Sequence, residues 1–211
     1  MPKPRESRHL VPFEVLAVLA IAVVPLPEPV PAALPLLVVA SLSLWLRGRS
    51  WADVIGGPVR GSTAAAVGAL AGGLALGFAL LAGAPAIELL GPRAVEWSAH
   101  PIVRGNLSLL ALVAVYVAAT AVATELALRG WIVERVLELS PGPPVLPVLV
   151  GAFAEALLAP GDGPARIGAA LFGIGLGWMY AAGGRSIVAP LCARLAFEVG
   201  AVLLEGLRVI G

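Results

Sequence analysis

The chain has 211 residues, of which 59% are hydrophobic and only 13% are charged, with a formal net charge of +1 and a mean hydropathy of +0.96. A soluble domain of this length needs many more charged side chains to cover its surface, so the composition predicts a membrane protein. The sequence has no basic stripe with interleaved aromatic residues, which argues against nucleic-acid binding. The single cysteine, Cys192, excludes an internal disulfide and a cysteine-rich metal cluster.

Apolar runs divide the chain into about seven candidate spans, judged by the roughly 20 residues that a helix needs to cross the hydrocarbon core. In chain order they are 11–24, 30–46, 63–81, 107–128, 145–159, 167–182 and 186–207. The first follows basic residues, as in a signal peptide, but no small-residue cleavage pattern comes after it, so we expect a retained span. The fifth is short for a full crossing. The predicted fold class is all-α, a polytopic membrane helix bundle that forms one domain over residues 1–211.

Two parts of this domain differ in composition. Residues 1–60 are expected to form a helix hairpin, joined by a proline-rich turn at 25–29, followed by a basic cytoplasmic loop. Residues 61–211 are expected to hold a glycine-rich span and the rest of the core. Three pairs of glycines stand four residues apart, a spacing that lets helix backbones approach closely in lipid. They are Gly68 and Gly72, Gly73 and Gly77, and Gly173 and Gly177.

The distribution of basic residues predicts the orientation of the spans. One set of tails and loops carries Lys3, Arg5, Arg8, Arg47, Arg49, Arg60, Arg135 and Arg185. The loops on the opposite side carry Arg93, Arg104 and Arg166. This bias predicts a cytoplasmic N-terminus, and an interfacial segment on the outer side within residues 83–106, which include Trp97. The preference for arginine over lysine, with abundant alanine, glycine and proline, is associated with high-GC bacteria, so we expect a bacterial inner (cytoplasmic) membrane protein.

Charged residues inside the predicted spans are costly in lipid and indicate a paired or functional role. Glu125 and Arg129 stand four residues apart near the end of the fourth span, and Arg194 and Glu198 stand four apart in the last. Glu155 is the lone charge of the fifth span. A glutamate and an arginine one helical turn apart can pair locally, whereas carboxylates in a dry cavity can also serve acid–base chemistry. The spacing alone fits both readings.

Polar side chains also form stripes along two of the spans. Tyr116, Thr120 and Thr124 step by four along the fourth span, and Glu205 follows Glu198 by seven residues in the last. Because lipid offers no hydrogen-bond partners, we expect these stripes to face the interior of the bundle.

Four stretches carry a resemblance to a known family. They are LRGRSWAD at 46–53, TELALRG at 124–130, GIGLGWMY at 173–180 and SIVAPLCARLAFE at 186–198. In this order they resemble the CPBP family of intramembrane metalloproteases, which includes the CAAX prenyl endopeptidases and the Abi proteins of bacteriocin immunity. The resemblance implies a protease-like core in the C-terminal four spans and intramembrane endopeptidase activity.

The chain departs from this family at the catalytic positions. The resemblance implies a Glu-Glu pair in the first motif, a histidine in the second, and a histidine and an asparagine in the last; a glutamate and a histidine are thought to activate water, and the last pair to stabilise the oxyanion. Here the first Glu is Thr124, although Glu125 and Arg129 remain. The stretch 150–160, where the second motif falls, has no histidine. The last two positions are Arg194 and Glu198.

These replacements remove the expected chemistry. The two histidines, His9 and His100, fall in the tail and in a loop, and an arginine does not lose its proton. Arg129 is expected to keep Glu125 ionised and occupied. A catalytic zinc needs about three protein ligands, and the core offers only carboxylates and Cys192. We therefore predict no metal, no cofactor and no confident catalytic residue.

The last two replacements add opposite charges four residues apart, so a buried site tolerates both together better than either alone. We predict a structural ion-pair cluster of Glu125, Arg129, Arg194 and Glu198, with Glu155 as a further candidate member. The function that fits best is a non-catalytic family homologue, a membrane scaffold or an accessory subunit of a larger membrane complex, with lipids and other transmembrane proteins as partners. Two alternatives stay open: an active endopeptidase with a rearranged site, and a lipid- or small-molecule-binding membrane protein.

Overall fold

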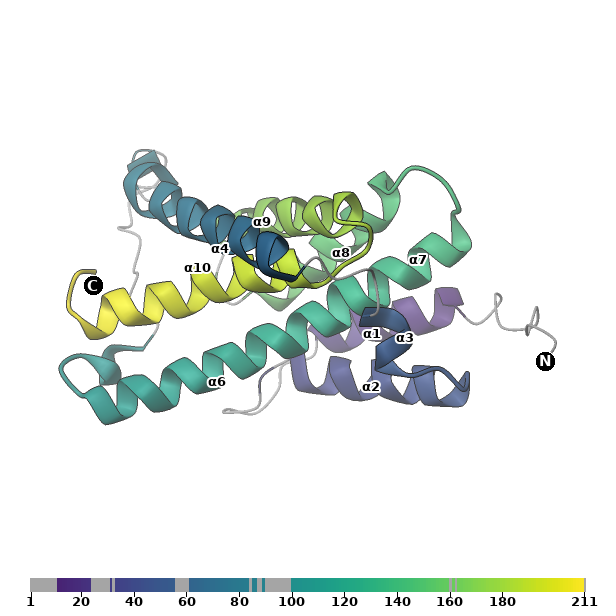
Figure 1. Cartoon of the computed structure of the whole chain (residues 1–211), viewed down its shortest axis with the longest axis horizontal. Helices are drawn as coiled ribbons and strands as arrows, with labels where there is room; N and C mark the ends of the chain where they lie inside the picture. The colour runs from purple at the N-terminus through teal and green to yellow at the C-terminus, as the bar shows by residue number, and fades with distance from the viewer. Residues whose placement is uncertain are drawn as a thin grey trace. The chain divides into compact units, whose positions relative to one another are not determined.

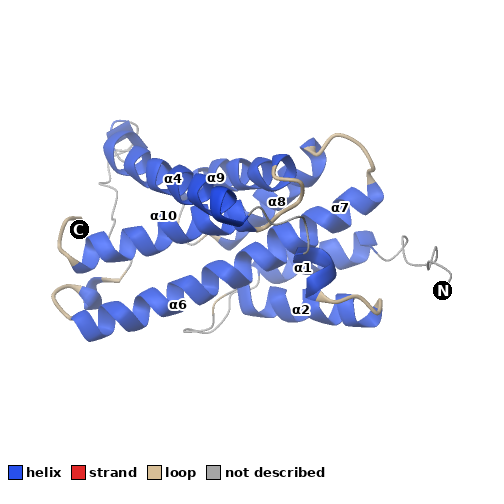
Figure 2. Ribbon diagram, viewed as in Figure 1, coloured by secondary structure: helices blue, strands red, loops and turns tan. Residues whose placement is uncertain are grey.

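The computed structural model describes residues 11–23, 31, 33–55, 61–83, 85–86, 89, 100–159, 161 and 163–210, and this part of the chain contains helices and loops but no strand (Figure 2). The all-α prediction is therefore confirmed. The chain divides into two compact units, and each unit combines two separate stretches of sequence. The first unit is Met1–Val59 with Ala123–Ile187, and the second is Arg60–Val122 with Val188–Gly211. The predicted division at residue 60 and the single membrane domain stay predictions.

The first unit contains the N-terminal helices and the middle of the chain. Its elements are α1 (Val11–Val23), α2 (Ala33–Leu46), α3 (Trp51–Ile55), the π-helical segment η4 (Leu126–Val133), α7 (Glu134–Leu139), α8 (Val145–Leu158) and α9 (Gly163–Ala182). The last turn of α6 (Leu107–Glu125) leads into η4 without a break, so that α6, η4 and α7 form one continuous helix (Figure 1).

The hydrophobic core of the first unit lies between α1, α2 and η4. Residues of α1 spaced by four and three, among them Val11, Val15 and Val18, are buried, because this spacing places them on one helical face. They pack with Leu36 of α2 and with Trp131 of η4. The N-terminal hairpin, which lies outside the catalytic motifs of the resemblance, thus covers the helix that carries the first motif.

Glycines bring α8 and α9 together, as their spacing predicts. A Cβ placed on Gly173 would lie 3.0 Å from the Cα of Ala152, and one on Gly177 would lie 2.9 Å from Cγ1 of Val148. Either distance is too short for a relaxed contact, so the absence of these side chains permits the close approach of the two helices.

The second unit pairs the glycine-rich span with the last helix. Its elements are α4 (Gly61–Phe78), the π turn η2 (Ala79–Gly83), η3 (Pro101–Val103), most of α6, and α10 (Val188–Gly206). α4 packs along α10 (Figure 1). A Cβ on Gly68 or Gly72 would overlap the backbone carbonyl of Ala189 or Ala193.

The other glycine pair of α4 behaves differently from the prediction. A Cβ placed on Gly73 or Gly77 would meet nothing within 4 Å among the described residues. Gly73 follows Gly72 by one residue and is therefore rotated by about 100° around the helix, away from the face that contacts α10. The spacing is the same for both pairs, and only the rotation of the helix distinguishes them.

Seven helical stretches correspond in order to the predicted spans, counted over the described residues: α1, α2, α4 with η2, α6 with η4 and α7, α8, α9 and α10. Three of them, Gly61–Gly83, Leu107–Leu139 and Gly163–Ala182, are long and apolar enough by themselves to cross a membrane, and α1, α2 and α8 are shorter apolar helices. The helix that contains the fourth predicted span, 107–128, continues beyond it to Leu139. The charge of Arg129 within this helix is paired with Glu125.

Three further predictions concern this architecture. The N-terminal tail with His9, the proline-rich turn at 25–29 and the segment around Trp97 lie outside the described residues. The prediction that the polar stripe on α6 faces the interior of the bundle is wrong for Tyr116, which is 43% exposed. Thr124, on the same stripe, is buried. The Thr120 hydroxyl donates a hydrogen bond to the backbone carbonyl of Tyr116 at 3.0 Å, within the same helix.

Candidate functional site

Three charged side chains meet inside the first unit. Arg129 is 0% exposed, and its Nη1 lies 3.2 Å from Oε1 of Glu125 and 2.5 Å from Oε2 of Glu155. Glu125 is also 0% exposed and Glu155 is 6% exposed. The guanidinium donates a further hydrogen bond through Nη2 to the carbonyl oxygen of Gly173 at 3.0 Å. One arginine thus joins two carboxylates and a backbone carbonyl.

Four helical segments supply these groups. Glu125 ends α6, Arg129 lies in the π-helical segment η4, Glu155 comes from α8 and Gly173 comes from α9. π-Helical turns are rare and occur frequently at functional sites, where they change the direction of the side chains that follow. The first motif of the resemblance therefore lies on an unusual part of the helix, which composition alone does not indicate.

Glycine at position 173 makes room for this arrangement. A Cβ there would lie 3.2 Å from Cβ of Glu155 and 3.3 Å from its Oε2. The sequence analysis named Glu155 only as a candidate member of the cluster, and it missed the carbonyl of Gly173 entirely. The glycine-rich stretch 173–180 was the available signal, but it was interpreted as helix packing alone.

The remaining predicted site residues lie in both units. Thr124, at the position of the family's first carboxylate, is buried in the first unit. Arg194 and Glu198 belong to α10 in the second unit, where Nη1 of Arg194 lies 2.7 Å from Oε1 of Glu198. The predicted pairing one turn apart is therefore present in both helices. The prediction that both pairs form one cluster stays a prediction.

The charge balance of the first group is uneven. Glu125 and Glu155 carry two negative charges, and Arg129 supplies one positive charge. Two carboxylates joined to one guanidinium form a compact ionic group whose members hold each other in place. Removing any one of them from such a buried group is far more costly than breaking a surface pair.

The arrangement does not fit a catalytic metal ion. No three His, Cys, Asp or Glu side chains lie together as a ligand set in the described part of the chain. The cationic guanidinium of Arg129 also lies where a metal ion between the two carboxylates would have to bind, and like charges repel. We therefore derive no step through a metal.

Histidine is not part of the buried group in the described residues. His100 precedes η3 in the second unit, and its backbone N–H donates to Oε2 of Glu205 at 3.0 Å. Oε1 of the same buried carboxylate lies 3.6 Å from Nη2 of Arg104. Glu205 thus joins the loop before α6 to the end of α10, a structural role that its place on the predicted stripe did not indicate.

A second polar network surrounds one end of the first unit. Nη1 of Arg49 lies 2.8 Å from Oε1 of Glu138, and Nη1 of Arg135 lies 2.8 Å from Oε2 of the same carboxylate. The indole N–H of Trp51 donates to Oγ of Ser41 at 3.1 Å. These bonds anchor the basic stretch 46–53 beside the helix of the first motif.

Gly130, which follows Arg129 in the first motif, allows the same stretch to pack closely. A Cβ placed on it would lie 3.4 Å from Cγ1 of Val54 and 3.7 Å from Cζ3 of Trp51. The two stretches are far apart in the sequence, and the structure brings them into contact. The Arg-Gly of the first motif thus combines a buried charge with a surface on which α3 packs.

The fold and the buried ionic group define an α-helical membrane protein with charges held in its core. Residues 106–200, from the start of α6 into α10, match the family described as type II CAAX prenyl endopeptidase Rce1-like. This match over the C-terminal part of the chain confirms the resemblance to the CPBP family, and together with the apolar helices it supports a CAAX-protease-like membrane protein. No curated protein and no solved structure matches the chain.

Proposed function

We propose that this protein is a non-catalytic member of the CAAX-protease-like group, which acts as a membrane scaffold or as an accessory subunit of a larger membrane complex. The observation that carries the proposal is that both carboxylates of the group, Glu125 and Glu155, contact the guanidinium of Arg129, and that no histidine lies with them among the described residues. One of these carboxylates would have to bind and activate the attacking water. An arginine in that place keeps its proton and competes with water for the carboxylate oxygens.

The other positions support the same conclusion. A threonine hydroxyl at position 124 is no base near neutral pH, and the family's last histidine and asparagine are replaced by Arg194 and Glu198. The resemblance assigns proton transfer and oxyanion stabilisation to these groups. A permanently charged guanidinium and a carboxylate that bears negative charge suit neither task well. They suit mutual pairing.

We further propose that Arg194 and Glu198 belong with Glu125 and Arg129 to one structural ion-pair cluster. The complementary charges of the two replacements support it, since a buried arginine or a buried glutamate alone would be costly. Arg194→Leu tests the idea, with Arg166→Leu, on the exposed start of α9, as the matched control. We expect only the first variant to lower the thermal stability and to weaken partner binding. Unchanged stability and binding in Arg194→Leu would contradict the proposal.

The proposed partners are membrane lipids and other transmembrane proteins. The open face of α4 at Gly73 and Gly77, flanked by the exposed Leu70 and Leu74, supports contact with a partner helix. The arginine bias of the loops supports a bacterial cytoplasmic membrane with the N-terminus inside. Labelling of single cysteines introduced at both ends of α9, in a Cys192→Ser background, tests this topology.

The decisive experiment compares proteolysis with complex formation. The protein, reconstituted in lipid, is incubated with a farnesylated CAAX peptide, and a mild-detergent extract is searched for copurifying membrane proteins. We expect no cleavage above that of Glu125→Gln and a stoichiometric partner. The match to an endopeptidase family favours an active peptidase as the second candidate. Cleavage that is present in the native chain and lost in Glu125→Gln would establish that candidate and overturn our proposal.

A further inference from the structure

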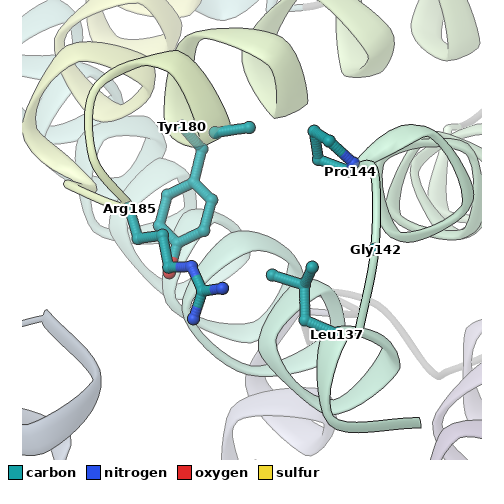
Figure 3. Close-up of a pocket in the computed structure, with 6 residues that line it drawn as sticks. Leu137, Gly142, Pro144, Tyr180 and Arg185 are labelled. Atoms are coloured by element: carbon teal, nitrogen blue, oxygen red, sulfur yellow. The ribbon is translucent and has the colours of Figure 1, made fainter. Parts of the chain in front are cut away.

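A small pocket lies in the first unit, where α7 and α9 end. It has a volume of about 190 Å³ and is lined by Leu137, Gly142, Pro144, Tyr180, Ala181 and Arg185 (Figure 3). None of these residues belongs to the buried ionic group of Glu125, Arg129 and Glu155. The pocket is therefore separate from the site discussed above, and no part of the proposed function uses it.

The two polar side chains that line the pocket, Tyr180 and Arg185, both contact the carboxylate of Glu134. Tyr180, which is almost fully buried, donates its hydroxyl hydrogen bond to Oε1 of Glu134 at 2.9 Å. Nη1 of Arg185 lies 3.4 Å from Oε2 of the same carboxylate, and the Arg185 side chain is 57% exposed. Glu134 thus contacts both polar side chains. Figure 3 shows the Arg185 guanidinium beside the Tyr180 ring, on the side of the pocket that Leu137 borders.

The backbone that carries Arg185 is unusual. The N–H groups of Gly183 and Arg185 donate to the carbonyls of Met179 and Tyr180, both at 2.9 Å, which closes the C-terminus of α9. Gly184 has φ 70° and Arg185 has φ 65°. The left-handed region suits glycine at position 184, but it costs a side-chain-bearing residue such as arginine conformational energy. The C-terminus of α9 can end with Gly184 alone in the left-handed region, without a second such residue that bears a long side chain. We therefore interpret the backbone strain at Arg185 as a sign that its guanidinium has a function.

The helix that leads to Arg185 indicates the level of the pocket in a membrane. The apolar helix Gly163–Ala182, whose length matches one crossing, ends beside the pocket. The ends of spanning helices lie at the level of the lipid headgroups, where phosphate groups are concentrated and arginine side chains reach the interface. A cation at a helix C-terminus is also stabilised by the helix dipole, which accounts for its placement but not for the pocket beside it.

We propose that this pocket binds a phosphate group, with Arg185 as its main ligand-binding residue. A guanidinium presents parallel N–H donors that match two phosphate oxygens. Leu137, Pro144 and Ala181 offer an apolar wall to the carbon chain next to the phosphate. The negative charge of Glu134 offsets the positive charge of Arg185, so recognition depends on the geometry of the phosphate more than on net attraction. The proposal is independent of whether the protein is catalytic.

Phosphate can reach this site from a phospholipid or from solution, and the experiment separates the two sources. The purified protein in a maltoside detergent is titrated with short-chain phosphatidylglycerol, with a phosphate-free galactosyl diacylglycerol, and with inorganic phosphate, and binding is followed by native mass spectrometry and by the shift in Tm. We expect saturable binding of the phospholipid and none of the galactolipid. Binding of inorganic phosphate as tight as that of the phospholipid would overturn the lipid as the source.

Three variants test the residues. Arg185→Gln is expected to weaken phospholipid binding about tenfold, the effect of losing one charge-assisted contact. Leu137→Trp fills the pocket without changing any charge and should weaken binding similarly. Arg49→Gln removes an arginine of the polar network outside the pocket and should leave binding unchanged. Equal losses in Arg185→Gln and Arg49→Gln would show general attraction to basic residues and would overturn the site, as would unchanged binding in both pocket variants.

Discussion

Arg129 is the side chain whose removal we expect to be most costly. Its fully buried guanidinium contacts Glu125, Glu155 and the carbonyl of Gly173. Replacement by methionine preserves most of the apolar stem but leaves two buried carboxylates without this cation. Removing one partner from a buried ion pair costs about 3–5 kcal/mol, because the remaining charge stays desolvated. We expect the free energy of unfolding of Arg129→Met to fall by at least this amount, since the arginine joins two carboxylates.

The assay is thermal unfolding in mild detergent, followed by size-exclusion chromatography after heating. In a chain of this size each kcal/mol lowers Tm by about 2–4 °C, so the expected fall is about 6–20 °C. Arg166→Met is the matched control, because Arg166 lies on the exposed start of α9 and its loss should leave Tm unchanged.

A triple variant separates charge from packing. Arg129→Met combined with Glu125→Gln and Glu155→Gln removes the three charges that contact one another here, and replacing both members of a buried ion pair is often close to neutral. We therefore expect the triple variant to recover most of the lost stability. A single variant with an unshifted Tm, or a triple variant no more stable than the single one, would refute this account of the site.

Three further predictions follow from the packing and the hydrogen bonds. Gly72→Leu should separate α4 from α10 and abolish a stable fold, whereas Gly73→Leu, one position around the helix, should leave the melting curve unchanged, since only the first would overlap backbone. Gly173→Ala should cost about 1–3 kcal/mol in thermal unfolding, because its Cβ crowds α8 and the buried carboxylate there, and an unchanged Tm would contradict that packing. Trp131→Phe leaves a smaller buried ring and loses the 3.3 Å bond to Ser43, so the cavity and the lost bond together should cost about 2–4 kcal/mol, and Ser43→Ala in the Phe background should cost little more.

The positions of the helices were largely predictable because they depend on hydropathy. The predicted spans 11–24 and 145–159 agree with α1 and α8 to within one residue at each end. The fourth predicted span, 107–128, lies within a longer helix that continues through Arg129 to Leu139. The position of a charged residue in the sequence does not indicate whether it forms an ion pair in the folded protein.

The candidate site was predictable only in part. Glu125 and Arg129, and likewise Arg194 and Glu198, are one helical turn apart, so their local pairing follows from helix geometry and is confirmed. The contact between Arg129 and Glu155 joins residues 26 positions apart and depends on how α8 is placed beside η4. No periodicity in the sequence encodes that placement.

By itself, then, the sequence predicted a lipid environment, the helices and the family resemblance, and it showed that no histidine stands at the motif positions where the family has one, because each of these depends on composition or on residues near one another in the chain. Only the tertiary structure decided that Glu155 is part of the ionic group, that the carbonyl of Gly173 completes it, and that Tyr180, Glu134 and Arg185 meet at a pocket. The physical reason is the rotation of each helix about its own axis. Packing against neighbouring helices and the π-helical turns of η4 decide which side chains of a helix face the interior. A step of one residue, as from Gly72 to Gly73, changes a buried contact into open space.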